Sequence, residues 1–222
     1  FAMYIPSQCA ICRAWPSHAI CDACVAAFGR PVPRCQQCAA ESALQICRAC
    51  LQNPPMLNAC WAAMSYTWPW VSLIGQFKFQ SHPSWARQFA LLMHSTPYVA
   101  DALEQAQVLI PIPLSFQRLS ERGFNQSLVL SQQLSREKTQ VSSLLRMRNT
   151  LAQSSLPRNE RLTNLKGAFA VAPFMAAKLR GQRILLIDDV MTSGATLNAA
   201  AQVLKQAGAA HVSALVFART PA

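Results

Sequence analysis

Three apolar runs in the second half of the chain have the length and composition of buried strands. They cover residues 107–112, 183–187 and 211–217, and Val, Ile and Leu are prominent in them. The first run ends in the sequence Pro-Ile-Pro, which bends the chain away from a strand. The pattern therefore predicts three strands that are covered on both faces.

Helical spacing separates these runs. Residues 124–138 place apolar positions among polar ones, and the segment that follows the second run does so more regularly. Its apolar positions are Leu197, Ala200, Ala201, Leu204 and Ala207, with Gly208 at the expected helix end. Strands that alternate with helices predict an α/β fold, a parallel sheet with helices on both faces. Ligands of such sheets bind at the carboxyl ends of the strands.

Eight of the nine cysteines lie within the first 50 residues, in four pairs that each enclose two residues. The last four repeat the spacing of the first four, displaced by 26 positions. The first unit is Cys9, Cys12, Cys21 and Cys24, and the second is Cys35, Cys38, Cys47 and Cys50. Two tight turns that each present two sulfurs complete a tetrahedron around one Zn²⁺ ion, so we expect two structural zinc ions.

Disulfides are the rival interpretation of this pattern, and they are typical of secreted chains. The spacing leaves both sequential and cross-braced pairing of the cysteines open. Cys60 stands outside the repeat and is expected to be a small buried residue, whereas His18 is expected at the surface because four cysteines already fill its unit. Residues 51–55 resemble a linker, so we expect a zinc-binding module over residues 1–55 and a larger domain over 56–222.

An aromatic stretch opens the larger domain, with Trp61, Tyr66, Trp68 and Trp70 close together. We interpret it as a strand or hairpin that packs against the main sheet. Apolar residues make up 52% of the chain and charged residues 13%, which excludes disorder of the whole chain. Prolines interrupt the long uncharged stretch at 49–77, and no secretory signal is evident. We therefore expect a cytoplasmic protein without membrane insertion.

The formal net charge of +11 favours partners that carry phosphate, either a nucleotide or a nucleic acid, although it also aids solubility alone. Asp188 and Asp189 directly follow the apolar run 183–187, and adjacent acids repel each other unless a ligand or cation compensates them. The loop 192–196 then supplies hydroxyls and backbone N–H groups at the start of a helix, where phosphate binds well. A helix cap would explain only one of the acids.

The run from Asp188 to Thr196 resembles the phosphoribosyl pyrophosphate (PRPP) motif of type I phosphoribosyltransferases, and implies their fold. This resemblance assigns the ribose hydroxyls to Asp188 and Asp189, with Mg²⁺ accompanying PRPP. It assigns the 5-phosphate to the loop residues Thr192, Ser193, Gly194, Ala195 and Thr196.

Further segments are similar to the ComF/GntX family, whose members have the same cysteine module and are associated with natural transformation and the use of external DNA. The segments contain Pro111-Ile112-Pro113, Arg118, Arg122-Gly123-Phe124-Asn125-Gln126, Thr150, Gln153, Arg158, Arg161, Asn164 and Phe169. The resemblance implies a PRPP-binding protein with an unknown phosphoribosyl acceptor. The alternative is a non-catalytic module that senses PRPP or a nucleotide and binds single-stranded DNA or other DNA-uptake proteins.

Basic residues supply the cations that a pyrophosphate needs. Arg118 and Arg122 lie in the loop beyond the first strand, and Arg122 is grouped with the two acids as a candidate catalytic residue. A second basic stretch contains Arg146, Arg148, Arg158, Arg161 and Lys166. Three uses remain open for this stretch: a solvated surface, a loop that closes over PRPP, or a track for nucleic acid. No residue beside the phosphate loop stands out as a general base, since Val190 and Met191 precede it.

Overall fold

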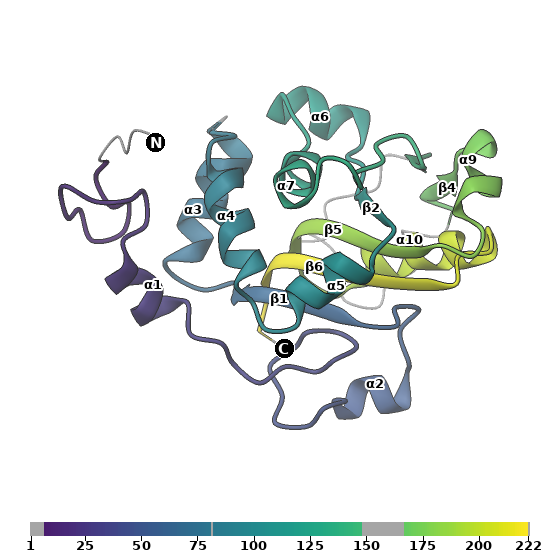
Figure 1. Cartoon of the computed structure of the whole chain (residues 1–222), viewed down its shortest axis with the longest axis horizontal. Helices are drawn as coiled ribbons and strands as arrows, with labels where there is room; N and C mark the ends of the chain where they lie inside the picture. Colours follow the sequence, from purple (N-terminus) through teal and green to yellow (C-terminus); the bar gives the residue numbers. More distant parts are fainter. Residues whose placement is uncertain (1–6, 81, 148–166, 222) are drawn as a thin grey trace.

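The computed structural model describes residues 7–80, 82–147 and 167–221. A four-stranded sheet forms its centre, with the strand order β1-β6-β5-β2 and parallel pairing throughout. Its strands are β1 (Cys60–Ser65), β2 (Val108–Pro111), β5 (Arg183–Met191) and β6 (His211–Arg219). Helices cover both faces of this sheet (Figure 1), which confirms the predicted fold class.

The two faces of the sheet bury different sets of side chains. Ile184 and Leu186 of β5 pack in one cluster with the helix α10, whereas Leu185 and Ile187 pack in the other with α3, α4 and α7. This alternation follows from the two-residue period of a strand. The helices are α3 (Trp70–Phe79), α4 (Trp85–His94), α5 (Val99–Gln105), α6 (Phe116–Arg122), α7 (Gln126–Leu134), α9 (Pro173–Leu179) and α10 (Ala195–Gln206). A separate antiparallel pair joins β3 (Leu144–Arg146) to β4 (Phe169–Val171).

Aromatic rings fill the core between the sheet and the helices α3 and α4. The ring of Phe217 on β6 stacks on Phe89 of α4, with their centroids 4.0 Å apart. Trp70 and Phe77 of α3 meet these two rings edge-on. All four side chains are almost completely buried, so this cluster fixes α3 against the sheet.

The predicted strands and helices all occur, but several of their ends differ from the expectation, as does the predicted linker. The strand predicted at 183–187 continues to Met191, because β6 pairs with β5 along this whole length. The helix predicted at 124–138 is shorter, since the side chain of Asn125 caps its start by accepting from the N–H groups of Ser127 and Leu128. The expected linker 51–55 overlaps the helix α2 (Arg48–Gln52).

The aromatic stretch forms a strand followed by a helix, not a hairpin. β1 is an edge strand that pairs with β6, and α3 begins at Trp70. The indole of Trp70 donates a 2.9 Å hydrogen bond to the carbonyl of Phe28, which ends the helix α1 (Asp22–Phe28) of the first cysteine unit. Cys60 is buried, as predicted, and His18 is exposed.

The purple segment with α1 lies beside α3 in Figure 1, and the blue segment that leads to α2 passes along the outer edge of β1. The backbone N–H of Cys60 donates to the carbonyl of Gln36, so the second cysteine unit joins the open edge of the sheet. Across the described ranges, no helix has both the length and the apolar composition that crossing a bilayer requires.

Candidate functional site

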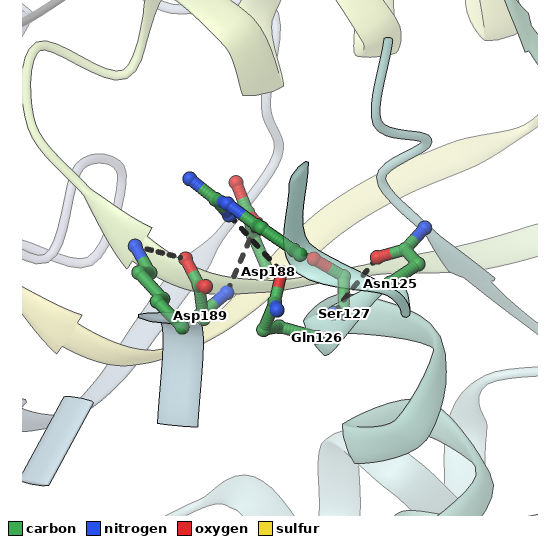
Figure 2. A network of polar contacts seen from close by, with 7 residues as sticks. Asn125, Gln126, Ser127, Asp188 and Asp189 are labelled. Atoms are coloured by element: carbon green, nitrogen blue, oxygen red, sulfur yellow. Dashed lines mark hydrogen bonds and ion pairs between the residues drawn. The ribbon is translucent and has the colours of Figure 1, made fainter. Parts of the chain in front are cut away.

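The two adjacent acids lie near the carboxyl end of β5, and side chains from the helices α7 and α3 contact them (Figure 2). Oδ1 of Asp188 accepts a 2.8 Å hydrogen bond from the hydroxyl of Ser127 on α7. The same oxygen accepts from the backbone N–H of Asp189 at 2.9 Å. Asp189 forms a 2.9 Å ion pair with Nζ of Lys78, near the end of α3, and both side chains are largely buried.

Burial and the neighbouring acid change the proton affinity of Asp188. Burial comes first, the negative charge of Asp189 adds to it, and together they raise the pKa of Asp188 to about 7. The Ser127 hydroxyl and the Lys78 ammonium oppose this shift but do not cancel it. The negative charge of Asp188 is therefore poorly stabilised. A cation or a hydroxyl donor that binds beside Asp188 would stabilise this charge.

The segment between β2 and α7 places Ser127 against Asp188. Ser115 caps α6 through its hydroxyl, and Gly123 ends that helix at a positive φ of 77°. Asn125 accepts from the first N–H groups of α7 and donates through Nδ2 to the carbonyl of Ile112 at 3.0 Å. The start of α7 is thus tied to the end of β2, the neighbour of β5 in the sheet.

Arg122 lies against Gln126, the residue before Ser127, and two contacts orient its guanidinium. One Nη donates to Oε1 of Gln126 at 3.0 Å, and the guanidinium carbon lies 5.3 Å from the ring centroid of Phe79. Gln126 is only 1% exposed, so its amide is a rigid acceptor. α3 therefore supplies both Lys78, which contacts Asp189, and Phe79, which supports Arg122.

Two further arginines share the electrostatic environment of the acids. Burial lowers the pKa of Arg118, with repulsion from Arg122 second, while Asp188 and Asp189 partly oppose the shift. Burial likewise lowers the pKa of Arg146, with repulsion from Arg118 second and Asp188 opposing. Arg146 donates to the carbonyl of Pro113 at 3.4 Å, which holds β3 beside the chain that leaves β2. The structure thus brings Arg118, Arg122 and Arg146 to one site.

The other predicted residues of the middle region lie outside the described residues. They are Arg148, Thr150, Gln153, Arg158, Arg161, Asn164 and Lys166.

The predicted phosphate loop connects β5 to α10. Gly194 precedes α10 with a positive φ of 78°, and a Cβ atom at this position would collide with the side chain of Met191. Thr192, Ser193 and Thr196 are half-buried, and Thr192, Gly194 and Thr196 line a hollow of about 10 Å³ together with Asp188. This volume holds roughly one water molecule. This hollow is therefore smaller than a phosphate group.

A much larger cavity, of about 900 Å³, lies at the opposite ends of the strands. The first residues of β5 and β6 line it, together with β1 and the segment 31–36. Asp188, Asp189 and the loop 192–196 do not line it. We place the candidate site at the acids despite its smaller hollow, because charged groups converge there at the carboxyl ends of parallel strands.

The eight repeated cysteines form two separate groups of four, in sequential order. Within each group all four sulfurs lie within 4.8 Å of one another. Zn–S bonds of about 2.3 Å place tetrahedral sulfurs about 3.8 Å apart. The sulfur distances are 3.8 Å for Cys9 and Cys24, 3.6 Å for Cys12 and Cys21, and 3.7 Å for Cys38 and Cys47. Each group could therefore hold a zinc ion, and the grouping differs from the cross-braced alternative.

The backbone of the two groups repeats as their sequence does. Arg13 and Ala39 occupy equivalent positions and both have positive φ angles, of 66° and 54°. Burial would raise the pKa of Cys9, but backbone N–H donors outweigh it and lower the pKa to about 6. Burial, followed by contacts with the other thiols, raises the pKa of Cys24 to about 12. A metal ion would have to displace the proton from Cys24, so its binding should depend on pH.

Two residues of the candidate site escape the sequence interpretation. Ser127 directly follows Asn125-Gln126, and a serine at the start of a helix suggests only a capping role, not a contact with Asp188. Lys78 is the first charged residue after the long uncharged stretch 49–77. Its position in the sequence does not indicate that it contacts Asp189. Tertiary packing alone determines both contacts.

Comparisons with known proteins give matches over most of the chain. Residues 97–222 match the phosphoribosyl transferase domain family. The chain is 32% identical to "DNA utilization protein YhgH" of Salmonella typhimurium, over 97% of this chain and 98% of that protein. It is 32% identical to "Competence protein F" of Haemophilus influenzae, over 90% of each chain. It is 29% identical to "Competence protein ComFC" of Bacillus subtilis, over 92% of this chain and 86% of that protein.

We expect two zinc ions per chain, because both groups offer four thiols at tetrahedral spacing. Elemental analysis of the protein prepared under reducing conditions measures this. Replacing Cys12 by Ser should lower the zinc content and loosen the first group. Cys60→Ser is the matched control and should retain both ions, because Cys60 lies outside both groups. Absence of zinc, or disulfides found by mass spectrometry, would contradict the expectation.

We also expect the ligand-free protein to lose stability as the pH rises from about 4 to about 7. The folded state binds the Asp188 proton more tightly than the unfolded state does, so the favourable contribution present at low pH disappears over this range. Asp188→Asn should remove this slope. The difference in unfolding free energy between variant and parent should grow by about 2 kcal/mol between pH 5 and pH 8, in favour of the variant.

Urea unfolding at several pH values provides the measurement for Asp188→Asn. Asp101→Asn, at an exposed position of α5, is the control and should follow the parent at every pH. Parallel profiles for the parent and Asp188→Asn would show that burial does not perturb Asp188.

Proposed function

Because the chain belongs to the ComF family of phosphoribosyltransferase-like proteins, we propose that it binds PRPP at the carboxyl end of β5 and serves the use of DNA in the cell. The observation that carries this proposal is the convergence of three chemical features at one place. An acidic pair lies between a loop that suits phosphate and a group of three arginines. PRPP carries ribose hydroxyls, a 5-phosphate and a pyrophosphate, and each feature suits one of them.

In the proposed complex, Asp188 and Asp189 accept hydrogen bonds from the ribose hydroxyls. The segment Thr192, Ser193, Gly194, Ala195 and Thr196 donates backbone N–H groups and hydroxyls to the 5-phosphate at the start of α10. Arg118 and Arg122 bind the pyrophosphate, and Arg146 strengthens the positive potential there. The poor stabilisation of the Asp188 charge supports this assignment, because hydroxyl donors from the ligand would improve it.

The acidic pair also suits Mg²⁺, since carboxylate oxygens are the ligands that this ion prefers. When bound, Mg²⁺ would neutralise charge on the pyrophosphate. Lys78 already neutralises Asp189, so its ammonium must move aside or turn toward the pyrophosphate when the metal ion enters. After either movement, the positive charges of Lys78 and the arginines remain near the ligand.

In a transfer reaction, the bond between C1 of the ribose and pyrophosphate breaks while the acceptor forms a new bond to C1. The sugar carries positive charge in the transition state. Arg118 and Arg122 would hold the departing group, and the two acids would hold the ribose in place. Val190 and Met191 occupy the positions before the loop, so no general base for the acceptor stands out there. A sensor that binds PRPP without transferring it is therefore the second candidate function. Pyrophosphate release from PRPP, screened over nucleobases and amines, distinguishes an enzyme from a sensor.

The remaining proposals concern the rest of the molecule. We assign structural zinc to both cysteine groups, and a zinc-binding module to residues 1–55 ahead of a larger domain at 56–222. The names of the relatives refer to competence and DNA utilization, which supports DNA as a partner. We further propose that this DNA is single-stranded, that other DNA-uptake proteins are partners, and that the protein acts in the cytoplasm. The net charge of +11 supports phosphate-bearing partners in general.

Replacing both Asp188 and Asp189 by Asn should abolish measurable PRPP binding in the presence of Mg²⁺. The change keeps the shape of the side chains but removes both charges and the partner of Lys78. Isothermal titration calorimetry measures the affinity, with Asp101→Asn as a control that should bind as the parent does. Unchanged affinity in the double variant would exclude the assignment of these acids.

Binding of single-stranded DNA should be weak, independent of sequence and steeply reduced by salt, because it would depend on phosphate contacts. Arg158→Ala with Arg161→Ala should weaken it if the central basic stretch is the track, and saturating PRPP should then compete. The charge-matched control is Arg13→Ala with Arg30→Ala, at exposed positions of the cysteine region. Loss of binding in the control alone would move the track to that region, and fluorescence anisotropy at two salt concentrations measures both.

A further inference from the structure

A single buried arginine connects the second cysteine group to the phosphate loop. Arg219, at the end of β6, is only 8% exposed. Its Nε donates to the backbone carbonyl of Cys38 at 3.0 Å. Its Nη1 donates to the carbonyl of Thr192, the first loop residue, and at 3.4 Å to that of Met191. One rigid guanidinium therefore holds a metal-site turn and the phosphate loop at a fixed separation.

Three further contacts join the same two parts of the molecule. Sγ of Cys60 lies 3.6 Å from Sδ of Met191, the residue before the loop. The backbone N–H of Met56 donates to Oδ1 of Asn198 at 2.8 Å, and Nδ2 of Asn198 donates to the carbonyl of Gly194 at 3.1 Å. Ala39 and Leu57 belong to the apolar cluster that also contains Met191, Ala195 and Leu197. The second cysteine group and the chain that follows it thus pack against the loop and the start of α10.

The first cysteine group has the same spacing but different neighbours. Cys9 and Cys24 pack in the other apolar cluster, with Met64 and Trp70. Cys12 occupies the position that corresponds to Cys38 in the repeat, and it is exposed. The repeat therefore provides two groups with matched metal chemistry, of which only the second contacts the phosphate loop through Arg219.

A metal ion in the second group would fix the orientation of the Cys38 carbonyl, because the sulfur of the same residue is a ligand. Without the metal, this turn loses its main constraint, since small sites of this kind fold with their ion. The guanidinium of Arg219 would then lose the Cys38 carbonyl as a fixed acceptor, which is costly for a buried group. Its hydrogen bond to the Thr192 carbonyl would weaken as a result. A loop that must be ordered during binding has a lower affinity for its ligand.

We propose that Arg219 is a positioning residue that couples metal occupancy of the second cysteine group to the affinity of the phosphate loop for a phosphorylated ligand. This inference depends on the proposed function for its ligand, PRPP. Coupling between two binding sites is reciprocal, so PRPP should also hold the metal more tightly in the second group. A purely structural role of the zinc module would produce neither effect selectively.

The first experiment compares two double variants of the full chain, Cys21→Ser with Cys24→Ser and Cys47→Ser with Cys50→Ser. Each should lose one zinc ion, because each removes half of the ligands of one group. We expect PRPP affinity to fall about tenfold in the second-group variant and by less than about twofold in the first-group variant. Equal losses in both variants, or no loss in the second, would overturn the coupling.

The second experiment tests Arg219 itself. Arg219→Met should weaken PRPP binding, and its combination with the second-group variant should cause little further loss, because both changes break one connection. Additive losses would overturn the role of Arg219. Zinc release to a chelator provides a measurement that needs no cysteine variant. PRPP should slow the release of one zinc ion in the parent but not in Arg219→Met, and equal release rates would contradict the proposal.

A third measurement separates this inference from the proposed function. If the parent does not bind PRPP, the proposed ligand is wrong, but hydrogen exchange can still report on the loop. Removing the second metal should speed amide exchange at residues 192–198, whereas removing the first should leave it unchanged. Unchanged exchange after loss of the second metal would overturn the coupling whatever ligand the site binds.

Discussion

Two adjacent carboxylates at the end of a buried strand impose the constraint on which the site depends. Asp188 and Asp189 repel each other where little water reaches them, and each requires a partner from elsewhere in the chain. Ser127 on α7 supports the first, and Lys78 on α3 supports the second. Both helices cover the same face of the sheet. The acids are therefore tolerable only when this face is correctly assembled, so the fold and the site cannot be separated.

The arginines around the acids are subject to the same constraint, because their positive charges are also partly buried. Arg118 and Arg146 are half-buried, and burial together with mutual repulsion lowers the pKa of each. In Asp188 and in these two arginines, burial thus disfavours the charged form, although their opposite charges attract one another. A ligand that offers hydroxyl donors at one end and a polyanion at the other would improve both sets of interactions. This argument favours a phosphorylated sugar over a simple anion.

Local patterns in the sequence predict the strands, the alternation with helices and the repeat of the cysteines, because each depends on neighbouring residues. The extension of β5 to Met191 is less predictable, since pairing with β6 continues after the apolar run has ended. The contacts of Lys78 and Arg219 are not predictable from local pattern. Each joins residues that are distant in the chain, and their residue types alone indicate only a surface cation. The acidic pair could be found because its chemistry is unusual for a strand end.

The two cysteine groups show how equal chemistry can serve different parts of one site. The first group carries α1, whose final carbonyl, from Phe28, accepts the hydrogen bond of Trp70 at the start of α3. The other end of α3 carries Lys78, the partner of Asp189. The second group reaches the phosphate loop through Arg219. Each group therefore braces one side of the acidic pair, the first through a whole helix and the second through one side chain. Only the second connection ends on the phosphate loop itself, whereas the first ends on the partner of Asp189, so we expect the metal of the second group to matter more for binding of the phosphate.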